Sequence, residues 1–333
     1  MLGSTERPLF EAYDLAMLDL DGVVYVGGDA VPDAPEHLER VRKAGMRLAF
    51  ITNNAARPPA RVAEHLRELG VDAAPEDVVT SAQAAARVLA ERLGAGARVV
   101  LLGAEGLREA LEQQDLVPVR VSDEDAVAVV SGYGPDIRWR DIMRAAVRIR
   151  DGLLWVASNT DRSIPTAYGV APGHGVLVDT IRNFSEVEPV VAGKPERPLL
   201  DETVRRVGGE RPLMVGDRLD TDIEGARNAG LDSLLVLTGV TGLAELVAAR
   251  PEQRPTYVSA DLGGLLEAHR PPADEDGAVV LGGWRASVES GRLVVDGDGD
   301  AGDRWRVCAV AGWRHLDESG EPADIDGVAS GHD

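Results

Sequence analysis

The chain has 333 residues, enough for two or three domains, and 44% of them are hydrophobic, which suits a globular protein rather than a disordered one. Its formal net charge of −21 argues against nucleic acid or an anionic membrane as a partner, because their phosphate groups would be repelled. The charge does not exclude a small phosphorylated ligand, which needs only one locally positive pocket.

Three further features bear on the compartment. Cys308 is the only cysteine, which excludes an intramolecular disulfide and a cysteine-based metal site. No apolar run approaches the roughly 18 residues of a membrane span. The N-terminal segment also lacks the basic and apolar regions of a secretory signal. We therefore expect a cytoplasmic protein that makes no membrane contact.

Apolar runs alternate with helical patterns in the first part of the chain. Leu15–Leu18 is typical of a buried strand, and a helix is expected over Ala34–Ala44. A second strand follows over Arg47–Ile51, and then a helix over Pro58–Leu69 that ends before Gly70. The alternation predicts an α/β fold with a doubly wound parallel sheet, in which ligands bind beyond the carboxyl ends of the strands.

The middle of the chain, residues 96–187, reads as an inserted α/β unit. A helix at Ala82–Leu93 precedes it. Within it, strands are predicted at Arg98–Leu102, Ala126–Val130 and Leu153–Ala157, and helices at Glu105–Gln113 and Arg140–Ile149. We expect the first sheet to resume at Val190–Val191. It then continues with helix Arg197–Val207, strand Pro212–Val215, helix Asp222–Ala229 and strand Ser233–Leu237. The core is thus expected to comprise residues 1–95 and 188–271.

A linker rich in proline and acidic residues, 270–277, precedes the last segment. Residues 277–333 are expected to form a small strand-rich module, with strands within Val279–Trp284, Arg292–Asp296 and Arg304–Trp313. The run Asp296–Asp300 resembles the start of a calcium loop. However, Ala301 replaces the glycine and Val307 the bidentate glutamate that such a loop requires, so a hairpin turn is the better interpretation.

Acidic residues follow two of the predicted strands. Asp19 and Asp21 lie on one side of an extended segment, since side chains alternate with a period of two. One such carboxylate can act as a nucleophile or metal ligand while the other transfers a proton. Asp217 and Asp222 follow a later strand and are the oxygen ligands that Mg²⁺ prefers. The alternatives are an ordinary turn at Asp19 and a helix N-cap at Asp222.

Phosphate-binding groups are expected after two other strands. The hydroxyl, amide and backbone N–H groups of Thr52, Asn53 and Asn54 can hold phosphate oxygens, although such a triplet also occurs in plain loops. Lys194 can neutralise charge on a transferring phosphoryl group, although a single lysine is more often a surface residue.

In chain order, the four motifs resemble those of the haloacid dehalogenase (HAD) superfamily, over residues 14 to about 270. They are Asp19-Leu20-Asp21-Gly22, Thr52-Asn53-Asn54, Lys194 and Gly216–Asp222. Lys194 lies 142 residues after Thr52, which leaves room for a whole domain. This spacing is similar to that of the subclass IIA phosphatases, whose large α/β cap sits between the second and third motifs. Further matching segments are Gly132-Tyr133, Ser158-Asn159-Thr160-Asp161, Pro172-Gly173-His174-Gly175 and Leu235–Thr241.

The resemblance implies a Mg²⁺-dependent phosphatase that acts through a phospho-aspartate. Asp19 would be the nucleophile and a metal ligand, and Asp21 the general acid and base, with its carbonyl on the metal. The phosphoryl oxygens would be held by Thr52, Asn53, Asn54 and Lys194. Asp217 would bind the metal, with Asp222 binding it directly or through water.

Substrate choice is expected to lie in the cap, at Tyr133, Asn159, Asp161 and His174. Asp161 could accept hydrogen bonds from hydroxyl groups, which favours glycerol 3-phosphate or another polyol phosphate. Aromatic residues are only 4% of the chain, an argument against pyridoxal phosphate, which, with sugar and nucleotide phosphates, is an alternative substrate. His174 could instead be an exposed turn residue.

Two further expectations follow from the resemblance, beside one alternative function from another class. The C-terminal segment is similar to the extension of actinobacterial glycerol 3-phosphate phosphatases. Caps of this type often support homodimers, so a dimer through the cap is expected. A different class of function, a phospho-accepting receiver-like module, would also place Asp, Thr and Lys at strand ends, but such a module has no large cap and no second acid.

Overall fold

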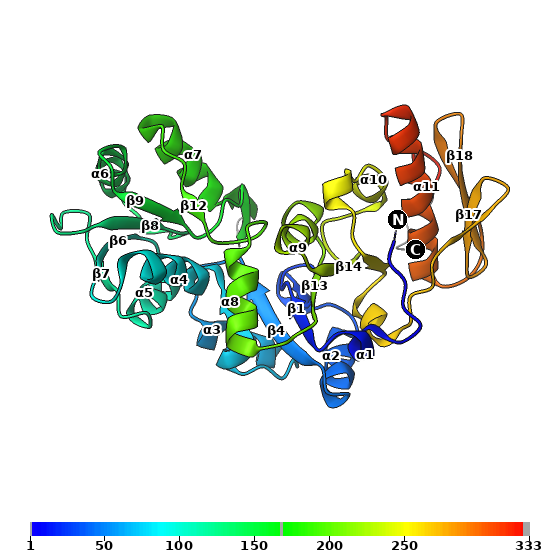
Figure 1. The fold of residues 1–333 in the computed structure, drawn as a ribbon, viewed down its shortest axis with the longest axis horizontal. Coiled ribbons are helices and arrows are strands. Elements are labelled where there is room, and N and C mark those ends of the chain that lie inside the picture. Colours follow the sequence, from blue (N-terminus) through cyan, green and yellow to red (C-terminus); the bar gives the residue numbers. More distant parts are fainter. Residues whose placement is uncertain (1, 167–168, 329–333) are drawn as a thin grey trace. The chain divides into compact units, whose positions relative to one another are not determined.

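The structure, a computed structural model, describes residues 2–166 and 169–328 and divides into two compact units. Unit 1 comprises Met1–Leu48, Leu69–Val71 and Gly209–Asp333, and unit 2 comprises Ala49–Glu68 and Asp72–Gly208. The last residues of the expected C-terminal module, 329–333, lie outside the described residues. Figure 1 labels the elements of each unit.

A parallel sheet forms the centre of unit 1. β1 (Leu15–Leu18), β13 (Pro212–Gly216), β14 (Asp232–Val236) and β15 (Tyr257–Ser259) pair in parallel with their neighbours. β4 (Arg47–Thr52) begins in unit 1 and continues into unit 2, where it pairs with β5 (Val78–Thr80). The strand order is β15-β14-β13-β1-β4-β5. These strands are almost wholly buried and apolar, as expected for a parallel sheet that is covered on both faces.

Short helices and a hairpin complete this part of unit 1. They are α1 (Leu9–Ala12), α2 (Ala34–Lys43), α9 (Glu224–Ala229), α10 (Leu243–Val247) and the hairpin β2 (Tyr25–Val26) with β3 (Asp29–Ala30). In α2 the buried residues Ala34, Leu38 and Val41 recur at helical spacing, and the predicted helix is confirmed. The helix expected from Asp222 differs: a π-helical turn, Leu219–Ile223, comes first, and α9 begins only at Glu224.

Unit 2 contains a second parallel sheet, of five strands. In the order β12-β9-β8-β6-β7, these are Val190–Val191, Leu154–Ala157, Ala128–Ser131, Arg98–Leu102 and Val117–Val119. The placement of Val190–Val191 in the first sheet is therefore wrong, because β12 pairs with β9. α7 (His174–Ser185) crosses from β9 back to β12 in a βαβ unit, which brings these two strands side by side. Two apolar residues alone cannot indicate which sheet they join.

The other elements of unit 2 largely follow the sequence pattern. β10 (Ser163–Thr166) pairs with β11 (Gly169–Pro172) as an antiparallel hairpin. The helices of unit 2 also include α3 (Pro59–Glu68), α4 (Ser81–Leu93), α5 (Glu105–Glu112), α6 (Trp139–Arg150) and α8 (Pro198–Val207). The five predicted helices that correspond to these are confirmed to within one or two residues at each end.

The C-terminal segment forms an antiparallel sheet and one long helix, α11 (Ala301–Ser319). The strands, in sheet order, are β16 (Ala273–Glu275), β17 (Ala278–Leu281), β18 (Trp284–Glu289) and β19 (Arg292–Gly297). The expected strand over Arg304–Trp313 is wrong, since these residues are helical. All of residues 305–313 are buried, so the segment carries no amphipathic pattern that would distinguish a helix from a strand.

The hairpin turn expected at Asp296–Asp300 is also wrong. The run connects β19 to α11, and Asp300 is the N-cap of the helix, with its carboxylate accepting a hydrogen bond from the backbone N–H of Asp303 at 3.2 Å. An acidic, glycine-rich run thus ends a strand and starts a helix.

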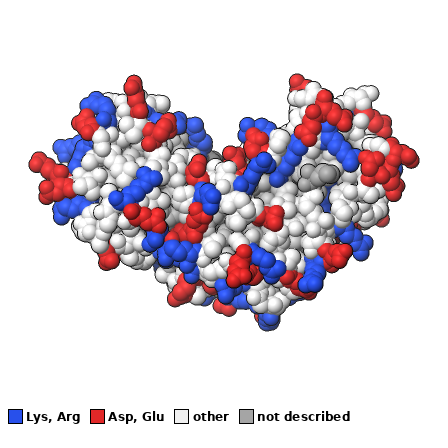
Figure 2. All heavy atoms as spheres, in the orientation of Figure 1, with Lys and Arg blue, Asp and Glu red and all other residues white. Residues whose placement is uncertain are grey.

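The surface is charged and mixed. Figure 2 shows Lys and Arg interspersed with Asp and Glu on the visible face of both units. Among the described residues, none of the helices combines the length and the apolar character that crossing a membrane would require.

The buried His269 of unit 1 predicts a pH-dependent stability. Burial lowers the pKa of His269 to about 4, and nearby Arg306 acts in the same direction. Between pH 6.5 and 4 the unfolded chain therefore binds a proton that the folded chain does not, so stability should fall as the pH falls, by on the order of 3 kcal/mol across this window. Urea midpoints measured from pH 7 to 4.5 should show this slope, and H269Q should reduce it but not abolish it, because burial also lowers the pKa of His174 to about 4. An equal slope in both proteins would contradict the prediction.

Candidate active site

Three carboxylates converge at the carboxyl ends of the strands in unit 1. Asp19 follows β1, and Asp217 follows the neighbouring strand β13. Asp222 comes from the π-helical turn that begins two residues after Asp217. Each of the three offers an oxygen atom, and these atoms lie within 4.8 Å of one another. Neighbouring parallel strands end at the same edge of a sheet, which is why residues far apart in sequence meet here.

Three segments close around the carboxylate of Asp217, which is fully buried. The backbone N–H of Val240 donates to Asp217 Oδ2 at 2.7 Å. Gly22 and Gly239 lie very close to the same oxygen. A Cβ would be 2.4 Å from it at Gly22 and 2.1 Å from it at Gly239. Thr238 Oγ1 donates to the carbonyl of Gly22 at 2.6 Å and so joins two of these segments. Only glycine fits at Gly22, which also has a positive φ of 91°.

The other two acids of the cluster differ in exposure. Asp222 is fully buried, and its Oδ2 accepts a hydrogen bond from the backbone N–H of Arg218 at 3.1 Å. A Cβ at Gly216 would lie 2.3 Å from that oxygen. Asp19 is half-buried, and its backbone N–H donates to the carbonyl of Val215 at 2.9 Å, which extends the pairing of β1 with β13. Asp21 is exposed and lies outside the three-carboxylate group.

The cluster fits a divalent cation. Carboxylate oxygens are the ligands that Mg²⁺ and Ca²⁺ prefer. Burying two carboxylates close together carries a large desolvation and repulsion cost unless a positive charge compensates it. The glycines at Gly22 and Gly239 let the backbone approach the Asp217 carboxylate more closely than any other residue could.

A second group of predicted residues meets in unit 2, around the side chain of Asn53. Its Nδ2 donates to the carbonyl of Lys194 at 3.0 Å and to Asp161 Oδ1 at 2.9 Å, while its Oδ1 accepts from the backbone N–H of Lys194 at 2.8 Å. Asn53 is 9% exposed and Lys194 only 2%. The amide of Asn53 therefore fixes the backbone of the lysine from both sides.

The backbone carbonyl of Asn53 is held as well. It accepts hydrogen bonds from Ser81 Oγ at 2.5 Å and from Asn159 Nδ2 at 2.6 Å. Asn159 Oδ1 in turn accepts from the backbone N–H of Asp161 at 3.1 Å. Ser81 is the first residue of α4, whose start is fixed by the N-cap Thr80. The sequence held no signal for Ser81, because a serine at a helix start is ordinary.

The remaining predicted residues lie nearby in the chain but make other contacts. Asn54 forms a local turn, in which its backbone N–H donates to Thr52 Oγ1 and its Oδ1 accepts from Ala56. Tyr133 is half-buried after β8. His174 begins α7 and is 3% exposed, and burial lowers its pKa to about 4. It is therefore a neutral core residue in this conformation rather than an exposed turn.

The chain matches known proteins over most of its length. Residues 16–117 match the family model described as haloacid dehalogenase-like hydrolase, and residues 191–265 match a second HAD-hydrolase-like model. The D-glycerol 3-phosphate phosphatase of Mycobacterium tuberculosis is 43% identical over 297 residues, which span 89% of this chain and 82% of that protein. The chain belongs to the haloacid dehalogenase-like hydrolase family. The four-motif resemblance is thus confirmed.

Other HAD relatives match with different extents. The acid sugar phosphatase of Staphylococcus aureus is 34% identical over 76% of this chain and 97% of its own length. A crystal structure of glycerol phosphate phosphatase from M. tuberculosis in complex with magnesium superimposes with a TM-score of 0.84 at 41% identity, over 95% of this chain and 94% of that one. The structure of the 4-nitrophenylphosphatase from Thermotoga maritima superimposes with a TM-score of 0.71 at 30% identity, over 78% of this chain and 98% of that one. Of these three matches, the one to the M. tuberculosis structure covers the largest share of this chain.

The contacts of Asn53 predict that its removal will loosen unit 2. N53A would leave the backbone groups of Lys194 without their side-chain partner in a buried setting, so we expect a loss of about 1–3 kcal/mol in the free energy of unfolding. Urea denaturation measures this loss, and N54A, which removes one local contact, is the matched control. Equal stability of N53A and the parent protein would contradict the prediction.

Proposed function

We propose that the protein is a Mg²⁺-dependent phosphomonoester hydrolase that acts through a phospho-aspartate on Asp19, with glycerol 3-phosphate or a similar small polyol phosphate as substrate. The observation that carries the proposal is the buried carboxylate cluster at the strand ends, with Asp19 as its most accessible member. Support for the substrate comes from the 43% identity to a D-glycerol 3-phosphate phosphatase over 89% of the chain.

The acids of unit 1 divide into metal ligands and reacting groups. Asp19, Asp217 and Asp222 would hold the Mg²⁺, with Asp222 acting directly or through water, and the carbonyl of Asp21 would complete the protein ligands. When bound, the ion offsets the repulsion between an anionic nucleophile and an anionic phosphate. The hydrogen bond from Val240 orients Asp217 for this task.

The reaction takes two steps at one phosphorus atom. In the first, a carboxylate oxygen of Asp19 forms a bond to phosphorus, the bond to the ester oxygen breaks, and Asp21 gives its proton to the leaving alkoxide. In the second, Asp21 takes a proton from water, whose oxygen attacks phosphorus, and the bond to Asp19 breaks to release inorganic phosphate. The exposure of Asp21 suits this exchange of protons with solvent.

The polar group of unit 2 supplies the phosphate and substrate contacts in this proposal. Lys194 and the Thr52-Asn53-Asn54 segment would hold the phosphoryl oxygens. Asn53 would act through its bonds to Lys194 as much as through the phosphate. For the rest of the substrate we assign Tyr133, Asn159, Asp161 and His174. Of these, the half-buried Asp161 and Tyr133 would meet hydroxyl groups, and the buried Asn159 and His174 would shape the site.

Several broader assignments belong to the same proposal. The core would comprise residues 1–95 and 188–271, apart from β12, which pairs with β9. The cap would comprise residues 96–187 and the C-terminal extension residues 277–333. A cytoplasmic location accords with the single, buried thiol of Cys308.

A homodimer through the cap has support in α6. Its residues Trp139, Met143 and Val147 recur at helical spacing and are 62%, 53% and 37% exposed. Arg144 and Arg148 of the same helix lie beside Asp123 and Glu124 in one surface hollow, so a second copy could meet this face with complementary charges. Light scattering on the parent protein and M143E measures the molar mass in solution, and a monomeric parent would refute this assignment.

The nucleophile assignment predicts a complete loss of turnover in D19N. The amide cannot attack phosphorus, while the side chain keeps its shape, so the fold should be unchanged by circular dichroism. D21N should still form the phospho-aspartate, but more slowly, and should slow its hydrolysis, which single-turnover phosphate release can resolve. Substantial steady-state activity in D19N would refute the assignment.

The substrate assignment predicts a ranked response to a panel of phosphomonoesters. Glycerol 3-phosphate should give a higher kcat/KM than glucose 6-phosphate, pyridoxal 5′-phosphate and a nucleoside monophosphate, and every activity should vanish on removal of Mg²⁺ with EDTA and return on its addition. Preference for a sugar phosphate would favour the function named for the S. aureus relative. Stable self-phosphorylation without turnover would favour the receiver-like alternative.

A further inference from the structure

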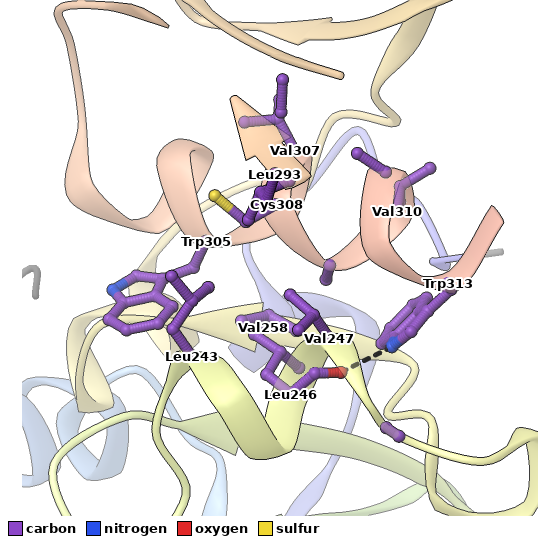
Figure 3. Packing of buried hydrophobic residues seen from close by; sticks show 14 of the residues in the cluster. Leu243, Leu246, Val247, Val258, Leu293, Trp305, Val307, Cys308, Val310 and Trp313 are labelled. Atoms are coloured by element: carbon purple, nitrogen blue, oxygen red, sulfur yellow. Dashed lines mark hydrogen bonds between the residues drawn. The ribbon is translucent and has the colours of Figure 1, made fainter. Parts of the chain in front are cut away.

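The last helix of the chain, α11, shares one hydrophobic core with the strand ends of the parallel sheet in unit 1. The cluster joins Trp305, Val307, Cys308, Val310 and Trp313 of α11 to residues on both of its sides. Leu293 of β19 lies on the side of the antiparallel sheet. Leu246 and Val247 of α10, with Val258 of β15, lie on the other, as Figure 3 shows. The helix therefore lies between the C-terminal sheet and the phosphatase core.

The contact between α11 and α10 is close and specific. Trp313 Nε1 donates to the carbonyl of Leu246 at 2.7 Å, the dashed line in Figure 3. Gly312 lies against Val247, where a Cβ on the glycine would be only 2.6 Å from the valine Cβ. The guanidinium of Arg254 covers the Trp313 ring at 5.4 Å and binds both carboxylate oxygens of Asp317, at 2.8 and 2.6 Å.

Helix α10 depends on these contacts for its position. It has five residues, too few for a helix to be stable by itself in water. Its apolar residues Leu243, Leu246 and Val247 are all buried in the cluster shared with α11. Packing from α11 therefore contributes to holding it in place, together with the strands and the π-helical turn that share the cluster.

The segment before α10 holds the metal-site carboxylate. Residues 237–241 run from the end of β14 to α10. Their start is fixed by the bond from the N–H of Leu237 to the carbonyl of Ala260 at 3.2 Å. Within the segment, the Val240 N–H donates to Asp217 Oδ2 and the Thr238 hydroxyl donates to Gly22. Because α10 begins two residues after Thr241, its position influences the positions of the Val240 N–H and the Thr238 hydroxyl.

We propose that α11 is a positioning element for the metal centre, and that Gly312 and Trp313 act through α10 and residues 237–241 on the orientation of Asp217. The inference rests on the metal site of the proposed function. It assigns a task to the C-terminal extension. Through α10, the extension restrains residues 237–241, a loop without regular secondary structure.

Two variants test the coupling with the full-length protein. G312A would push on Val247, and W313F would remove the hydrogen bond to Leu246 while keeping most of the ring. Titration calorimetry with MgCl₂ alone, without substrate, should show Mg²⁺ affinity weakened about 2- to 30-fold, the range that corresponds to coupling through one layer of packing. At saturating Mg²⁺, KM for glycerol 3-phosphate should stay within about twofold of the parent value, because the phosphate contacts are untouched.

The matched control is L293A, which removes a buried side chain from the opposite side of α11. It should lower the melting temperature at least as much as W313F while leaving Mg²⁺ affinity unchanged. Unchanged Mg²⁺ affinity in G312A and W313F overturns the inference. An equal loss of Mg²⁺ affinity in L293A also overturns it, because it would show that lower stability alone weakens binding. Failure of the parent protein to bind Mg²⁺, measured beside D217N as the blank, would instead overturn the proposed metal site and the inference with it.

Discussion

The carboxylate of Asp217 is the constraint on which most of unit 1 depends. A fully buried negative charge is costly unless hydrogen bonds and a cation compensate it, and two more carboxylates lie within 4.8 Å. Backbone groups contribute to this compensation, through the N–H of Val240 and the close approach of the glycines at Gly22 and Gly239. The segments that follow β1, β13 and β14 must therefore meet at one edge of the sheet. The parallel pairing of these strands brings their ends together there.

Unit 2 solves a related problem with an uncharged residue. Lys194 is 2% exposed, and a buried cation must be placed accurately to be useful. The side-chain amide of Asn53 forms hydrogen bonds with both the backbone N–H and the backbone carbonyl of Lys194. The same amide donates to Asp161, in the loop that leads to the β10–β11 hairpin. One asparagine thus ties the proposed phosphate-binding lysine to the loop proposed to recognise the substrate. Positioning of the phosphate and choice of the alcohol would then be linked through a single side chain.

The sequence predicted those features that recur as short motifs at strand ends, and it failed where burial removed the pattern. The four motifs, their order and the large insertion sufficed for the family, and the three acids indeed converge. The two-residue strand at Val190–Val191 was placed in the wrong sheet, because sheet membership depends on the crossover through α7. Residues 305–313 are buried throughout, so their helix showed no amphipathic period. The bonds of Asn53 and the role of Gly239 arise from tertiary contacts that spacing cannot encode.

The misread helix and the metal site are connected by one physical fact. The middle of α11, residues 305–313, is buried all round because it packs against two layers at once, the antiparallel sheet and the short helix α10. A surface module joined by a flexible linker would show one polar face along its helix. The C-terminal segment therefore does not behave as a separate domain, and its sheet is needed chiefly to cover the far side of α11.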